Sequence, residues 1–144
     1  MKKSWLLISL IVFLISCEVA SQEIHYGSDG CSFCKMTIVD SKHAAQLVTT
    51  KGKAFNYDAI ECMVNHLKEW DQAPIELYLV VDYANPKTLI DAQKAHYLIS
   101  ESIPSPMGAN LSAFGETDDL QLHISHGEVK TLGWNQLLDE LRNQ

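Results

Sequence analysis

The sequence predicts an α+β fold of two similar halves, residues 29–72 and 73–144, each with three strands followed by a helix. Short stretches rich in β-branched and aromatic residues precede one amphipathic segment in each half. The apolar positions of the second amphipathic segment start at Trp134, and those of the first start at Ile60, an offset of 74 residues. A repeated offset of this kind indicates an internal duplication.

The first half begins with strands separated by turn signals. Lys51-Gly52-Lys53 is typical of a hairpin turn between two of them. Asp58 is expected to cap the following helix, because Glu61 three places later completes a capping box. The expected strands are 37–39, 45–49 and 54–57, and the helical positions are Ile60, Met63, Val64 and Leu67.

The second half is expected to repeat this order. A loop at 102–110 contains two prolines and Gly108, so an irregular and fairly rigid connection is predicted there. The last two strands should form a hairpin around Gly127, and a helix should close the chain. The expected strands are 75–81, 95–99, 120–124 and 129–132, which is one strand more than in the first half, and the helix is 134–141.

The N-terminus has the features of a lipoprotein signal. Lys2 and Lys3 precede an apolar run that is too short to span a bilayer, and Ser16 directly precedes Cys17. Residues 1–16 are therefore expected to be removed, with Cys17 lipidated as the first residue of a tether over 17–28. Acyl chains anchor a protein to a membrane without spanning it, so we expect a periplasm-facing protein of the cell envelope. Glu18 after the cysteine leaves sorting to the outer membrane open.

Charge and motifs exclude several classes of function. Removal of residues 1–16 changes the formal net charge from -7 to -9, because Lys2 and Lys3 are lost. A chain this acidic is a poor nucleic-acid binder. It contains no nucleophile elbow, phosphate loop or histidine-zinc protease motif, so we do not expect an enzyme.

Sulfur ligands gather in one short segment. Cys31, Cys34 and Met36 lie within six residues, and soft sulfur favours Cu(I) over harder cations. If the chain is extended here, Cys34 and Met36 alternate along a strand and project to the same side. Met107 lies between Pro106 and a glycine in a polar loop, where it has little core to fill. It is therefore a candidate for a further thioether ligand.

Two other interpretations of the cysteines remain open. Cys31, Cys34, Cys62 and His66 form a C-x2-C…C-x3-H set that suits tetrahedral zinc in a structural treble-clef module for protein interaction. Alternatively, Cys31 and Cys34 form a redox disulfide, although the residues that follow them do not open a helix as in thioredoxin-type motifs. After lipidation of Cys17 an odd number of thiols remains. Outside the cytoplasm these thiols need shelter from oxidation or an occupying metal.

The chain resembles the NosL family of copper-chaperone lipoproteins over most of its mature length. The resemblance rests on the lipobox cysteine Cys17, the Cys34-Lys35-Met36 signature, Ala45-Gln46, Phe55-Asn56-Tyr57-Asp58-Ala59-Ile60, and Ser105-Pro106-Met107-Gly108 with Phe114.

This resemblance implies a fold related to organomercurial lyase and a periplasmic carrier of Cu(I). The family pattern assigns copper binding to Cys34 and Met36, while the position of Cys31 is not always a cysteine in the family. It also implies the partners, which are nitrous-oxide reductase and its membrane ABC-type maturation complex in denitrification. On this interpretation the protein passes Cu(I) on by ligand exchange.

Overall fold

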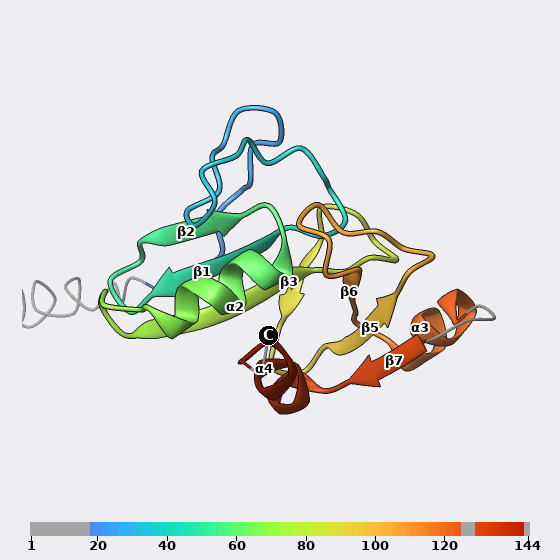
Figure 1. The fold of residues 1–144 in the computed structure, drawn as a ribbon. Helices are drawn as coiled ribbons and strands as arrows, with labels where there is room; N and C mark the ends of the chain where they lie inside the picture. Colours follow the sequence, from blue (N-terminus) through green and yellow to red (C-terminus); the bar gives the residue numbers. More distant parts are fainter. Residues whose placement is uncertain (1–17, 125–128, 143–144) are drawn as a thin grey trace, which may run out of the picture.

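Two antiparallel sheets and three helices make up the part of the chain that the structure describes, residues 18–124 and 129–142 of a computed structural model (Figure 1). The expected α+β class is confirmed. The lipoprotein signal and Cys17 lie outside the described residues. Within these residues, no helix has the length and apolar character needed to cross a membrane.

The first sheet has the strand order β2-β1-β3-β4. Its central strand β1 (Ala45–Thr49) is buried at every position because it pairs on both sides and is covered by a helix. Gly52 turns the chain between β1 and β2 with a φ of 78°, as the turn signal predicts. The other strands are β2 (Ala54–Tyr57), β3 (Ile75–Val81) and β4 (Leu89–Asp91).

The second sheet has the order β6-β5-β7, and every pairing in it is antiparallel. It consists of β5 (His96–Ser100), β6 (Leu111–Phe114) and β7 (Val129–Leu132). The helices are α2 (Ile60–Lys68), α3 (Thr117–His123) and α4 (Trp134–Arg142).

The two halves share a strand-strand-helix-strand unit, which differs from the expected order of three strands and then a helix. In β1-β2-α2-β3 and again in β5-β6-α3-β7, the first strand lies between the other two strands of its unit. The helix α3 therefore corresponds to α2, and α4 follows the second unit. β3 and β4 come after residue 72, yet they pair in the first sheet.

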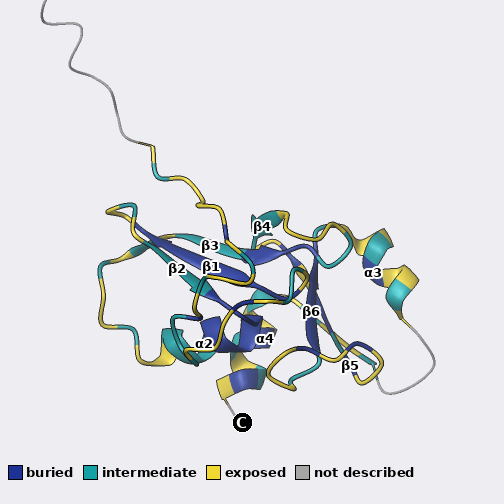
Figure 2. Ribbon diagram, turned by 90° about the horizontal axis from the view of Figure 1, so that it is seen from above, coloured by how far each residue is buried: buried dark blue, intermediate teal, exposed yellow. Residues whose placement is uncertain are grey.

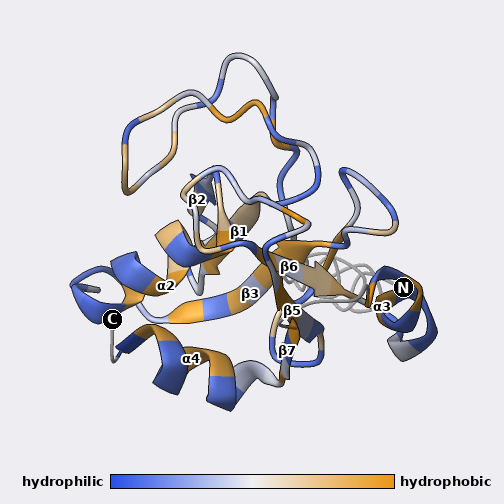
Figure 3. Ribbon diagram, turned by 45° about the vertical axis from the view of Figure 1, so that its right-hand side comes forward, coloured by the Kyte–Doolittle hydropathy of each residue, from blue (hydrophilic) through white to orange (hydrophobic). Residues whose placement is uncertain are grey.

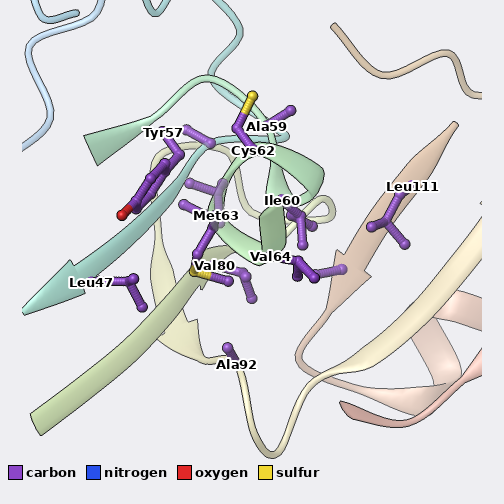
Figure 4. Packing of buried hydrophobic residues seen from close by; sticks show 14 of the residues in the cluster. Leu47, Tyr57, Ala59, Ile60, Cys62, Met63, Val64, Val80, Ala92 and Leu111 are labelled. Carbon is purple, nitrogen blue, oxygen red and sulfur yellow. The ribbon is translucent and has the colours of Figure 1, made fainter. Parts of the chain in front are cut away.

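Apolar packing between α2 and the first sheet forms the centre of the main core. Figure 2 shows buried residues along β1 and β6 and on part of α2, and the C-terminal end of β3 is also buried. In Figure 4, Met63 points toward Val80 of the sheet, while Cys62 points away from it. The neighbouring α4 buries Leu137 and Leu141, and Figure 3 shows its hydrophobic and hydrophilic residues on different sides.

Several local predictions are wrong. Residues 37–39 form no strand, and only an isolated bridge between Gly30 and Thr37 is present there. Residues 120–123 belong to α3 rather than to a hairpin strand, while Gly127 lies outside the described residues. Of the apolar residues Leu120, Leu122 and Ile124 in this segment, only Leu120 is buried. The short strands β4 and β6 were not expected.

The predicted capping box is also wrong. Ala59 occupies the N-cap position of α2 and makes no side-chain cap hydrogen bond. The Asp58 carboxyl is buried, and its Oδ1 atom has no hydrogen-bond partner in the structure. Burial raises the pKa of Asp58, and the nearby negative charge of Cys31 adds to that effect. Glu61 is directed to another loop, described below.

Candidate metal centre

The cysteine segment folds into a tight loop that β2 holds in place. The backbone N–H of Cys31 donates to the Met36 carbonyl at 2.8 Å, so the chain reverses between these two residues. On β2, the Asn56 carbonyl accepts from the backbone N–H of Ser32 at 2.7 Å, and the Asn56 amide donates to Asp29 at 3.0 Å. The loop is thereby fixed to the sheet.

The backbone conformation of Lys35 determines how Cys34 and Met36 lie relative to each other. Its φ of 67° is in the left-handed region, so Cys34 and Met36 do not alternate along an extended strand. The expectation that they project to one side of a strand is therefore wrong. Cys34 is half-buried, while the side chain of Met36 is 57% exposed. Lys35 Nζ donates to the Ser32 carbonyl at 2.6 Å, which stabilises the turn.

Three reduced cysteines meet where this loop contacts α2. The Sγ atoms of Cys31, Cys34 and Cys62 lie within 4.8 Å of one another. Cys31 and Cys62 are each only 1% exposed, so the cluster is open to solvent mainly at Cys34. Sulfur atoms this close can bind one soft metal ion together after small side-chain rotations.

The thiol of Cys31 ionises more readily than an ordinary cysteine thiol. A hydrogen bond from the Cys62 thiol lowers the pKa of Cys31 to about 4, against the opposing effect of burial. Backbone N–H groups of Asp58, Cys34 and Phe33 also donate to the Cys31 sulfur. The thiolate is the form of cysteine that binds metals. Cys31 can therefore bind a metal ion without first releasing a proton.

The other two thiols hold their protons more strongly. Burial raises the pKa of Cys34, although the backbone N–H of Met36 donates to its sulfur and acts in the opposite direction. The pKa of Cys62 is raised because its proton is shared with Cys31, and burial acts in the same direction. N–H donors directed at both sulfurs of a Cys-x-x-Cys turn resemble the outer hydrogen bonds that orient metal-binding thiolates.

Met107 lies in the loop between β5 and β6 and lines a cleft together with Cys62. The cleft has a volume of about 500 Å³ and is also lined by Phe33, Glu61 and Asn65, and the side chain of Met107 is 43% exposed. Met36 is not among the residues that line this cleft. The structure therefore places a thioether on a wall shared with one of the three clustered cysteines.

His66 is not part of the group of sulfurs. Among the residues described here, the atoms that lie within 4.8 Å of one another are the three cysteine sulfurs, without a histidine nitrogen. His66 Nδ1 is instead 2.7 Å from the Tyr57 hydroxyl, and its ring packs against Phe55 and Trp70. The structure thus assembles three of the four residues of the alternative zinc set.

A second polar group of interest links the two halves. His43 Nε2 lies 3.1 Å from Ser112 Oγ, and His43 Nδ1 lies 3.0 Å from Asp40 Oδ2. A serine, a histidine and an aspartate in contact in this order occur in the catalytic triads of hydrolases. Here the side chain of Ser112 is fully buried, so a substrate cannot reach it. We therefore interpret the group as a structural connection between the segment that precedes β1 and the strand β6.

Comparison with known proteins gives a consistent result. The sequence model of the family described as NosL matches residues 23–141. The chain is similar to a crystal structure of the copper chaperone NosL from Shewanella denitrificans, with 20% sequence identity and a TM-score of 0.69. The match covers 83% of this chain and 96% of that one, so the two share a fold. No curated protein matches.

Proposed function

The chain belongs to the NosL family, and on that basis we propose that it is a carrier of Cu(I) rather than an enzyme. The observation that carries this proposal is the cluster of three thiols within 4.8 Å, one of which has its pKa lowered to about 4. The similar crystal structure is that of a copper chaperone, which supports the same metal. Copper is the cargo, and Cys31, Cys34 and Cys62 are its proposed ligands.

The ligand set follows from burial and chemistry. Cys31 supplies a thiolate before copper arrives, and Cys34 and Cys62 complete a trigonal sulfur environment, which suits Cu(I). Met36 is exposed and lies two residues after Cys34, so its thioether is available to meet incoming or departing copper. A weaker neutral ligand at the exposed edge favours transfer, because a partner can replace it without breaking a thiolate bond.

The proposal extends to location and partners. The lipobox indicates that Cys17 is acylated and that the carrier faces the periplasm from a membrane, with the outer membrane as one destination. The family resemblance supports nitrous-oxide reductase and its ABC-type maturation complex as the recipients in denitrification. The acidic charge of the mature chain suits partners with basic surfaces.

Anaerobic Cu(I) titration of the chain without residues 1–17 tests the metal assignment. A chromophoric Cu(I) chelator serves as the competitor, and the Cys34→Ser variant is the principal comparison. We expect one tightly bound Cu(I) per chain and loss of tight binding in the variant. Absence of Cu(I) binding by the wild type refutes the proposal.

Two further outcomes separate the alternative interpretations. Copurification of stoichiometric zinc, with unfolding on chelation, favours the treble-clef module. Formation of a stable Cys31–Cys34 disulfide with a measurable potential, without Cu(I) binding, favours the redox interpretation. Mass spectrometry of alkylated protein, together with metal analysis of the same preparation, distinguishes these outcomes.

Methionine methyl groups report on the thioethers directly. The chain without residues 1–17 contains three methionines, Met36, Met63 and Met107. Met63 is fully buried against the sheet, so its methyl resonance is an internal control. With ¹³C-methyl labelling, we expect Cu(I) to shift the Met36 signal and to leave Met63 unchanged.

A further inference from the structure

Glu61 connects the helix that carries Cys62 with the loop that carries Met107. It lies on the first turn of α2 with its side chain buried, and its relative exposure is 5%. Glu61 Oε1 accepts a hydrogen bond from Ser105 Oγ at 2.5 Å and another from the backbone N–H of Ala109 at 3.3 Å. Figure 1 shows this loop, which follows β5, beside the beginning of α2.

The two hydrogen bonds lie on either side of Met107. Ser105 is two residues before it, and Ala109 is two residues after it. Between them, the backbone N–H of Gly108 donates to the Ser105 carbonyl at 3.0 Å, and Gly108 has a φ of 83°. One carboxylate oxygen therefore fixes both ends of the turn that presents Met107.

The direction in which Met107 is presented concerns the proposed copper site. Met107 and Cys62 line the same cleft of about 500 Å³, and Glu61 lines it as well. Glu61 and Cys62 are consecutive residues of α2, so any change in the helix position moves the thiol and the loop anchor together. The thioether is thus held in register with one of the three clustered thiols.

Glu61 is poorly explained as a stabilising residue. Its Oε2 atom is buried and has no hydrogen-bond partner in the structure. A carboxylate oxygen without a partner in the interior is unfavourable, and such groups are retained mainly where they have a function. The capping role that the sequence suggested for this residue is absent from the structure.

We infer that Glu61 is a positioning residue that holds Met107 over the cleft beside Cys62, so that the thioether meets Cu(I) during binding or release. This inference rests on the proposed function. Glu61 does not contact the metal itself, and it acts through the Ser105–Ala109 turn.

A double-mutant cycle between Glu61 and Met107 tests the inference. Cu(I) affinity and the rate of Cu(I) transfer to a chelator are measured for Glu61→Ala, Met107→Ala and the double variant. Loss of outer partners of metal ligands changes affinity by about tenfold or more. We expect Glu61→Ala and Met107→Ala to change the same property, either Cu(I) affinity or the transfer rate, by about tenfold. The double variant should be no worse in that property than Met107→Ala alone.

Two matched variants control for structure and charge. Glu69→Ala removes an exposed carboxylate from the other end of α2 and should behave as wild type. Glu61→Gln keeps an oxygen that accepts from Ser105 and Ala109, so it should rescue most of the effect. If Glu61→Ala fails to fold, Ser105→Ala replaces it, because this variant removes the shorter hydrogen bond without altering α2.

Three results overturn the inference while the wild type still binds Cu(I). The first is a Met107→Ala variant with wild-type affinity and transfer rate. The second is an effect of Glu61→Ala that persists in full in the Met107→Ala background. The third is a folded Glu61→Ala variant that behaves as Glu69→Ala does. If instead the wild type binds no Cu(I), the proposed function itself fails, so the two failures are distinguishable.

Discussion

Protons released on copper binding should count the thiol ligands. At pH 7 the Cys31 thiol is already ionised, because its pKa lies near 4. Cys34 and Cys62 are still protonated, since the pKa of each is raised. Every additional thiolate that joins Cys31 on the metal must therefore lose one proton. A three-thiolate site releases about two protons per Cu(I), and a site of Cys31 and Cys34 releases about one.

The measurement is a titration in weak buffer with an indicator dye. The chain without residues 1–17 is titrated anaerobically with Cu(I) supplied as its acetonitrile complex, which carries no protons. Cys62→Ser is the informative variant, because serine keeps a hydroxyl that can donate to Cys31 while it removes the third sulfur. We expect this variant to release about one proton fewer than the wild type.

The pH dependence has a definite sign. A lowered pKa means that the Cys31 thiolate persists as the solution is acidified, until the pH approaches about 4. Below that value Cys31 also binds a proton, so release rises toward about three per Cu(I) and affinity falls more steeply with acidification. Release of about three protons already at pH 7 would refute the assignment of a preformed thiolate, and release of none would exclude Cys34 and Cys62 as thiolate ligands.

Three further predictions concern the anchor, the exposed thioether and the core. Cys17→Ala should leave the precursor uncleaved or release the protein from membranes, and wild-type fractionation and mobility would contradict the lipoprotein assignment. Met36→Ile keeps side-chain bulk without sulfur, so it should weaken Cu(I) binding or slow its transfer without altering the melting curve; unchanged values for both would exclude a copper role for Met36. Leu47→Ala should lower the free energy of unfolding in urea by about 2–5 kcal/mol, because Leu47 is fully buried in β1. The control Leu122→Ala, at a position that is 82% exposed, should change it by no more than about 0.5 kcal/mol, and equal effects would contradict this account of the core.

The sequence predicted the elements whose residue pattern agrees with their packing. The first helix followed from Ile60, Met63 and Val64 at helical spacing, and all three are buried. By contrast, α3 presents only Leu120 to the core, so its amphipathic pattern is too weak to recognise as a helix. The strand β6 has only four residues and directly follows the predicted loop at 102–110, so its pattern is too short to distinguish it from a continuation of that loop.

The site was predictable in composition and less so in geometry. Cys31, Cys34 and Cys62 were candidates from their spacing, but their meeting depends on how β2 holds the loop against α2. The left-handed conformation of Lys35 could not be anticipated, because residues other than glycine adopt it rarely. The contact between Glu61 and Ser105 joins residues 44 positions apart, and a local capping pattern concealed it.

Reactivity and access are divided between different cysteines, and this has a kinetic consequence for the lifetime of the apoprotein. The nucleophilic thiolate, Cys31, is shielded from solvent, whereas the thiol that solvent reaches, Cys34, keeps its proton. Oxidants and alkylating reagents attack thiolates that they can reach, and this cluster offers them no such group. The three thiols can therefore remain reduced while the protein is free of metal, because the cysteine that would react is not the cysteine that is exposed.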